Sequence, residues 1–193
     1  MSTLTLSKGS NLSLTKTDPG MRQAMIGLGW DPRTTAGAAF DLDASALLVG
    51  ASGKVRSNDD FIFYNQLASK DGSVVHQGDN LDGGGDGDDE QVLVDLSTVA
   101  DDVDKIVIVV SIHDAIARGQ NFGQVRDAYC RVVNQESGNE VVRFDLTEDA
   151  AAETTMIFAE IYRNNGEWKF RAVGQGYATG LAGIASDFGI SLN

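Results

Sequence analysis

Strand-length runs of β-branched and aromatic residues recur along the chain, and Gly, Asn or Asp separates most of them. Short apolar or alternating runs bounded by such residues are typical of buried or half-buried strands. The pattern predicts strands near 4–6, 12–14, 24–28, 40–48, 61–63, 74–76, 90–96, 105–113, 128–134, 140–146, 155–163 and 167–175. Many short strands joined by short turns predict a mostly β chain that folds as a two-sheet antiparallel sandwich.

Turn and helix signals fit this architecture. Asn165-Gly166 predicts a tight hairpin turn, and Ser137-Gly138-Asn139 predicts a slightly longer one. A short helix is expected after Leu96, with Ser97 as its N-cap. A longer C-terminal helix is expected from apolar residues on one helical face, which we expect to pack on a sheet: Tyr177, Leu181, Ile184 and Phe188.

Length and composition favour one domain over residues 1–193. The chain is 42% hydrophobic, which is enough for a core of its own. We expect a cytoplasmic protein without direct membrane insertion, because there is no membrane-length apolar run and no N-terminal signal sequence. The only cysteine, Cys130, lies in an apolar run and is expected to be a buried, unreactive thiol.

The negative charge of the chain is concentrated in one segment. The net charge is −13, and the segment between Lys70 and Lys105 has eleven acidic residues and no basic one. Direct binding of nucleic acid or of an anionic membrane surface is unfavourable for such a chain, because phosphate binding needs clustered Lys and Arg.

Residues 79–90 read DNLDGGGDGDDE, with six carboxylates and four glycines. Calcium takes six to eight oxygen ligands and tolerates irregular geometry, so such a loop is a candidate calcium site. A solvated acidic loop is the alternative. An EF-hand is excluded, because loop positions 3 and 5 are Leu81 and Gly83, which have no side-chain oxygen, and the flanking segments are strand-like.

A second acidic pair favours metal binding. Asp41 and Asp43 interrupt an apolar strand, and their spacing of two places both on one face of the sheet. Buried carboxylates need a counter-charge, and no Lys or Arg is close in sequence. A wet edge strand is the alternative. Asn65 could add an amide oxygen, although a turn is the commoner role for such an Asn.

Enzyme motifs are incomplete. The segment 50–54 fails as a phosphate-binding loop, and the glycines at 174 and 176 lack the third glycine of a dinucleotide site. A carboxylate-pair hydrolase remains an alternative, with Asp41 or Asp43 facing Glu90 across a cleft, but few aromatic residues lie near these acids to bind a sugar. We therefore expect a protein that is not an enzyme.

The sequence resembles the TerD family of bacterial tellurium-resistance and general stress proteins over nearly its whole length. The matching stretches are LTLSKG at 4–9, GLGW at 27–30, FDLDASA at 40–46, FIFYN at 61–65, GDN at 78–80, GDDE at 87–90, GQNFGQV at 119–125 and GEWKFRAVGQG at 166–176. The resemblance implies a calcium-binding β-sandwich that takes part in resistance to tellurite, phages and colicins. It also implies other tellurium-resistance proteins as partners, with a link to a membrane-embedded protein and so to the inner face of the membrane.

Carried over by position, the family's metal-binding motif falls on Asp41, Asp43, Asn65, Asp79, Asn80, Asp88, Asp89 and Glu90. These residues would hold one or two Ca²⁺ ions. The chain departs from the family pattern at 81–86, which leaves the roles of Asp82 and Asp86 open. Two functions follow as hypotheses: a calcium-dependent interaction module, or an enzyme that acts directly on tellurite. Tellurite reduction needs electrons, and the sequence has neither a cysteine pair nor a flavin or nicotinamide motif.

Overall fold

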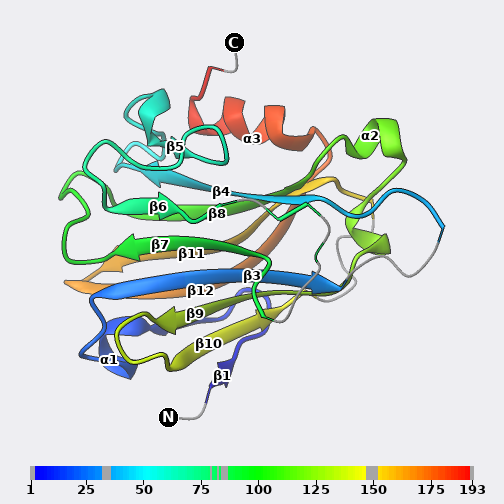
Figure 1. Cartoon of the computed structure of the whole chain (residues 1–193). Coiled ribbons are helices and arrows are strands. Elements are labelled where there is room, and N and C mark those ends of the chain that lie inside the picture. Colours follow the sequence, from blue (N-terminus) through cyan, green and yellow to red (C-terminus); the bar gives the residue numbers. More distant parts are fainter. Residues whose placement is uncertain are drawn as a thin grey trace.

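Two six-stranded sheets form the protein in a computed structural model, which describes residues 3–31, 36–78, 80–81, 83, 87–146 and 152–191 (Figure 1). Sheet A has the strand order β1 (Leu4–Thr5), β10 (Glu140–Asp145), β9 (Arg126–Asn134), β3 (Gln23–Asp31), β7 (Glu90–Asp95) and β6 (Val74–His76). Sheet B has the order β2 (Asn11–Ser13), β12 (Glu167–Tyr177), β11 (Thr155–Asn164), β8 (Lys105–Ile112), β4 (Leu42–Val49) and β5 (Phe61–Ile62). Apart from the parallel pair β1–β10, neighbouring strands are antiparallel, so the predicted sandwich is confirmed.

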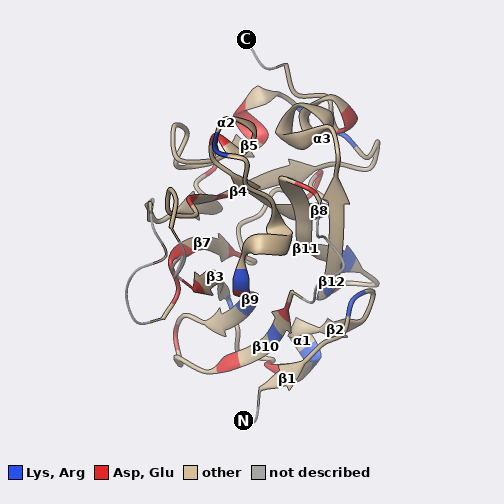
Figure 2. Ribbon diagram, turned by 90° about the vertical axis from the view of Figure 1, so that its right-hand side faces the viewer, with Lys and Arg blue, Asp and Glu red and all other residues tan. Residues whose placement is uncertain are grey.

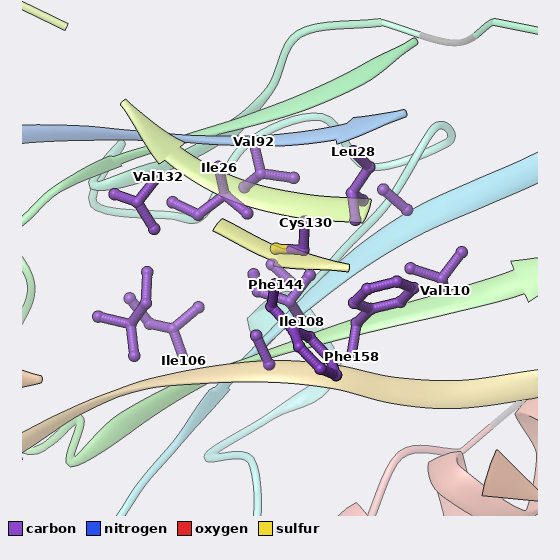
Figure 3. Close-up of a cluster of buried hydrophobic side chains, with 14 of the residues drawn as sticks. Ile26, Leu28, Val92, Ile106, Ile108, Val110, Cys130, Val132, Phe144 and Phe158 are labelled. Atoms are coloured by element: carbon purple, nitrogen blue, oxygen red, sulfur yellow. The ribbon is translucent and has the colours of Figure 1, made fainter. Parts of the chain in front are cut away.

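The main core lies between the sheets and consists of the inward-facing side chains of both. Figure 3 shows part of it, where Ile26, Val92 and Val132 of sheet A meet Ile106 and Phe158 of sheet B. Cys130 lies fully buried in this core, as the sequence predicts, and burial raises the pKa of its thiol.

Turn geometry explains the register of the hairpins. Asn165 and Gly166 both have positive φ, 53° and 76°, between β11 and β12, which is the backbone that a two-residue type I′ turn requires. Gly138, with φ of 72°, turns the chain between β9 and β10. Both predicted hairpins are therefore present.

The helices are short. They are α1 (Leu14–Thr17), α2 (Ala115–Arg118), α3 (Gly180–Phe188) and the 3-10 turns η1 (Asn58–Asp60) and η2 (Phe122–Gln124). The predicted C-terminal helix is α3, although Tyr177, which the sequence predicts on its apolar face, is the last residue of β12. Helix α3 lies near α2 on the same side of the molecule (Figure 1). Its residues Ile184 and Phe188 pack with Leu47 and Val109 on the outer face of sheet B. Within the described ranges, no helix has the length and apolar character needed to cross a bilayer.

The prediction of a helix after Leu96 is wrong. The chain makes a single turn there, in which the amides of Thr98 and Val99 donate to the carbonyl of Asp95. The Asp95 carboxylate, rather than Ser97, organises this turn, because it accepts from both the amide and the hydroxyl of Ser97. Helices α1 and α2 were missed, since four-residue helices carry almost no periodic signal.

Candidate metal centre

The acidic loop connects β6 to β7, and its last three residues are directed apart. Glu90 is the first residue of β7, and Asp88 and Asp89 precede it outside the strand. The Asp89 amide donates to the Leu28 carbonyl at 2.8 Å, which continues the β3–β7 pairing. Three consecutive carboxylates therefore reach three different environments.

Asp88 lies on the outer face of sheet A against Arg131 of β9. Its Oδ1 accepts from Arg131 Nε at 2.7 Å and from the Tyr129 hydroxyl at 3.0 Å. Arg131 also donates to Glu140 at 2.7 Å. Burial lowers the pKa of Arg131, but its hydrogen bonds to Asp88 and Glu140 outweigh this and raise it. Figure 2 shows basic ribbon segments on β9 and acidic ones near β7.

Two glycines in β3 make room for these contacts. A Cβ atom at Gly27 would lie 2.0 Å from Asp88 Oδ2, and one at Gly29 would lie 2.5 Å from the Tyr129 ring. A glycine inside a strand often marks such a close approach. The GLGW stretch is thus the sequence signal that could have located the partners of the acidic loop.

Asp89 binds the loop to Trp30. Its Oδ2 accepts from the Trp30 amide at 2.9 Å, and its Oδ1 accepts from Asn80 Nδ2 at 3.1 Å. Asn80 Oδ1 in turn accepts from the Gly83 amide at 3.1 Å. The Trp30 indole donates to the Phe40 carbonyl at 3.1 Å, so the loop is joined to the segment that enters β4.

Glu90 points between the two sheets and is 2% exposed. Its Oε2 accepts from the Ala44 amide of β4 and lies 3.6 Å from His76 Nε2 of β6. The carboxylate thereby bridges the sheets beside Asp43. This contact brings the end of the acidic loop to the strand that carries Asp43.

Asp41 and Asp43 meet charged or ionisable groups that the fold supplies. Asp41 Oδ2 lies 3.8 Å from Arg118 Nη1 of α2, and Asp43 Oδ2 lies 3.5 Å from His113 Nδ1. Asp43 shares the outer face of sheet B with Leu47 and is directed away from the main core. The groups that face Asp41 and Asp43 therefore come from the segment after β8. They could not be found among the residues that are close to these carboxylates in sequence.

The remaining predicted residues divide into three groups. Asp79 lies outside the described residues. Asn65 is exposed in the turn in which Phe63 and Gln66 exchange main-chain hydrogen bonds at 3.0 and 2.9 Å, and this is the turn role considered for it. Asn80, Asp88 and Asp89 line a hollow of about 600 Å³ together with Gln77, Gly78, Leu81 and Gln91.

The hollow is rich in carboxylate and amide oxygens, which are the hard donors that Ca²⁺ prefers. Among the described residues, no group of three or more His, Cys, Asp or Glu is arranged to hold an ion. Asn80 and Asp89 bring an amide oxygen and a carboxylate to the lining of this hollow, and both are ligand types that Ca²⁺ accepts. Asn80 and Asp89 are therefore the described residues whose chemistry fits a calcium ligand set.

Known proteins resemble this chain over nearly its full length. The TerD domain family matches residues 1–188. The chain is 59% identical over 188 residues to the tellurium resistance protein TerD of Serratia marcescens, covering 97% of this chain and 98% of that protein. It is 54% identical over 191 residues to general stress protein 16U of Bacillus subtilis (strain 168), covering 98% and 99%.

A solved structure supports the fold. It is that of a homologue of telluride resistance protein (TerD) from Streptomyces coelicolor A3(2), with a TM-score of 0.70 and 22% identity, covering 86% of this chain and 96% of that one. The family match spans both sheets and the acidic loop. The chain belongs to the TerD family.

Proposed function

We propose that this chain is a calcium-binding, non-enzymatic interaction module that contributes to tellurite and general stress resistance. The resistance role is supported by relatives that are named tellurium resistance and general stress proteins. The observation that supports calcium is the hollow at Asn80 and Asp89, which is placed beside a loop rich in Asp and Gly. A bound Ca²⁺ would supply charge neutralisation and order to this loop.

The residues have separate proposed tasks. Asn80 and Asp89, with Asp79 of the same loop, are proposed as ligands. Asp88 is held by Arg131, so its main task is to anchor the loop to β9. Glu90 fixes the start of β7 against Ala44, where Asp41 and Asp43 are the candidate ligands of a second ion.

Metal binding would also control how the module binds its partners. Ion binding would order the loop at the surface, and the ordered loop would contact other tellurium-resistance proteins. A membrane-embedded partner would bring this cytoplasmic module to the inner face of the membrane. We propose no direct contact with nucleic acid, in agreement with the charge of −13.

Two observations argue against the enzyme alternatives. Cys130 is fully buried, so its sulfur is not available to attack or reduce tellurite. The cavity that Asp43 lines does not include Glu90 among its described residues, so these two carboxylates do not flank one cleft in the described part of the chain. If purified protein consumed tellurite in the presence of NADH, the proposal of a non-enzymatic module would be wrong.

The test of calcium binding is calorimetry on metal-free protein, with Asp89→Asn as the variant and Asp59→Asn, a surface Asp on η1, as the control. We expect the Asp89→Asn variant to bind Ca²⁺ at least about tenfold more weakly, a difference of roughly 1.4 kcal/mol. The control should bind as the parent does. Equal affinity of all three proteins would remove Asp89 from the site. The number of ions bound per chain distinguishes one site in the loop from two sites.

A further inference from the structure

A second cavity, of about 660 Å³, opens on the outer face of sheet B between α2 and α3. Both helices lie on this side of the molecule in Figure 1. Cavities of this size take small organic ligands. The proposed calcium function does not use this cavity, apart from Asp43, which lines it.

The floor of the cavity is polar, whereas the part of the same sheet face that α3 covers is apolar. Asp43, Ser111 and Thr155 stand opposite one another on β4, β8 and β11, so their side chains form one row across the sheet. Ser111 and Thr155 are buried at 8% and 2% exposure. Under α3 the corresponding positions are Leu47, Val107, Val109 and Ile157. Beneath the cavity, hydroxyl groups thus stand where the neighbouring positions under α3 have aliphatic side chains.

One wall of the cavity is aromatic. Phe61 and Phe63 stack with ring centroids 4.6 Å apart, and Tyr64 meets Phe63 edge-on at 5.3 Å. Tyr64 is 39% exposed, so its ring remains accessible to a ligand.

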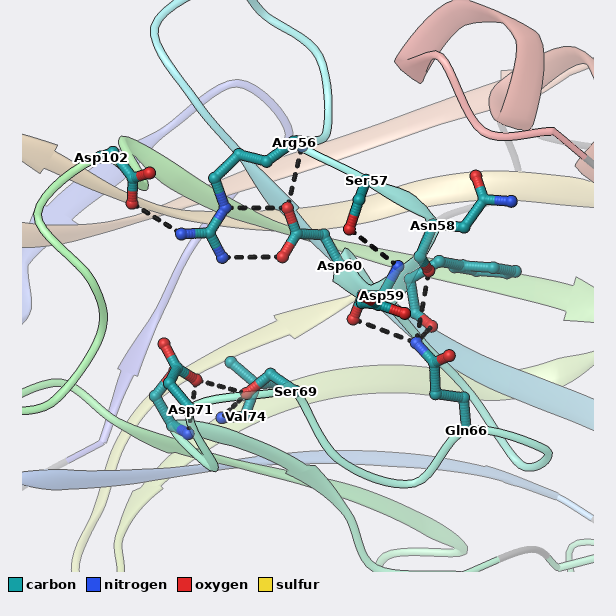
Figure 4. A network of polar contacts seen from close by, with 12 residues as sticks. Arg56, Ser57, Asn58, Asp59, Asp60, Gln66, Ser69, Asp71, Val74 and Asp102 are labelled. Atoms are coloured by element: carbon teal, nitrogen blue, oxygen red, sulfur yellow. Dashed lines mark hydrogen bonds and ion pairs between the residues drawn. The ribbon is translucent and has the colours of Figure 1, made fainter.

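Polar contacts hold this wall in place (Figure 4). Arg56 donates to Asp60, the residue before Phe61, from Nε to Oδ2 at 2.9 Å and from Nη2 to Oδ1 at 2.7 Å. Gln66 Nε2 donates to the Phe61 carbonyl at 2.7 Å. The rings are therefore presented on a fixed segment rather than on a loose loop.

The lining is negative. Asp43 and Asp114 stand on either side of His113, with Asp43 Oδ2 3.5 Å from Nδ1 and Asp114 Oδ2 3.6 Å from Nε2. The described residues around the cavity include no Lys or Arg. Two carboxylates against one imidazole leave a negative charge whether or not His113 is protonated. An anionic ligand is therefore disfavoured and a cationic one is favoured.

We propose that this cavity binds a small organic ammonium ion. The aromatic wall offers ring faces to the cation, the two carboxylates neutralise it, and the floor hydroxyls accept or donate hydrogen bonds at its polar end. Leu181 of α3 and Ile116 of α2, which is 92% exposed, would cover its apolar part. The module would then bind a second ligand besides the metal ion, and the two would share Asp43.

The test compares choline with its neutral isostere 3,3-dimethylbutan-1-ol by amide chemical-shift titration of the full chain. The titration is run in EDTA, so that no metal competes at Asp43. We expect choline to shift the amide signals of Phe63, Tyr64, Ile116 and Leu181, and the isostere to bind roughly tenfold more weakly. Equal binding of the two compounds, shifts centred elsewhere, or no shifts at these residues would overturn the proposal.

Two matched pairs of variants test whether choline binds in this cavity. Tyr64→Leu should weaken choline binding about fivefold, whereas Tyr162→Leu on β11, outside the cavity lining, should not change it. Asp114→Asn should weaken it about threefold at low salt, whereas Asp101→Asn, also exposed, should have no effect. Asn tolerates the left-handed backbone of Asp114, whose φ is 51°, so folding should be retained. Equal effects within each pair would mean that the cavity is not the site.

Discussion

Asp88 and Glu90, at the start of β7, are enclosed by donors from other strands, whereas Asp41 and Asp43 face groups near α2 at longer range. The Asp88–Arg131 pair has an N–O distance of 2.7 Å and a carboxylate that is 2% exposed. The pairs of Asp41 with Arg118 and of Asp43 with His113 measure 3.8 and 3.5 Å. Asp88 is thus held in a short ion pair across sheet A, whereas Asp41 and Asp43 lie at longer distances from Arg118 and His113.

The largest expected effect comes from Glu90. Replacing it with Ala removes the acceptor of the buried Ala44 amide and the partner of His76, which should cost about 2–4 kcal/mol of unfolding free energy. Urea denaturation in EDTA measures this. The exposed Glu136→Ala control on the β9–β10 turn should change by less than about 0.5 kcal/mol. Similar values for both variants would mean that Glu90 does not maintain the fold.

The second largest effect is expected at Gly27 of β3, where the absence of a side chain leaves room for the Asp88 carboxylate. Gly27→Ala would place a methyl group 2.0 Å from the Asp88 carboxylate, so this carboxylate and Arg131 have to shift. We expect a loss of about 1–3 kcal/mol. Gly20→Ala, where a Cβ atom would meet only Asp18 Oδ1 at 3.7 Å, is the matched control and should be tolerated. A stable Gly27→Ala variant would contradict the close packing of Asp88 on β3.

Double-mutant cycles compare the two regions directly. The coupling between Asp88 and Arg131 should be about 1–2 kcal/mol, because the pair is short and the carboxylate is buried. The coupling between Asp41 and Arg118 should be below about 1 kcal/mol, because the distance is longer and the guanidinium is 30% exposed. Reversed values would exchange the roles assigned to the two regions.

The smallest expected effect is on the unfolding free energy at alkaline pH. Burial and the nearby Asp88 raise the pKa of Tyr129 to about 12, above its ordinary value of 10.0. The folded state therefore holds the Tyr129 proton more tightly, and this contribution to stability is present below pH 10 and is lost as the pH rises towards 12. Tyr129→Phe should flatten the decline in unfolding free energy over this range. Tyr162→Phe, whose ring packs with Arg171, should leave the decline unchanged.

Local sequence patterns predicted the strands, both hairpins and the C-terminal helix, because alternation, positive-φ turn residues and helical spacing are encoded within a few residues. The partners of the acidic residues could not be predicted in this way. Arg131, His76 and Arg118 reach their carboxylates only through the pairing of distant strands and the position of α2. The helix predicted after Leu96 was wrong because the Asp95 side chain captures the amide of Ser97.

Calcium titration of EDTA-treated protein, followed by thermal unfolding, tests the central claim most directly. If the acidic loop binds the ion, Ca²⁺ should raise the melting temperature, with a free-energy gain of roughly 2.7 kcal/mol at a hundredfold excess over Kd. Calorimetry should report one or two ions per chain, and Asp89→Asn should lose most of the gain. Identical melting curves in EDTA and in millimolar Ca²⁺ would contradict the assignment of this protein as a calcium-binding module.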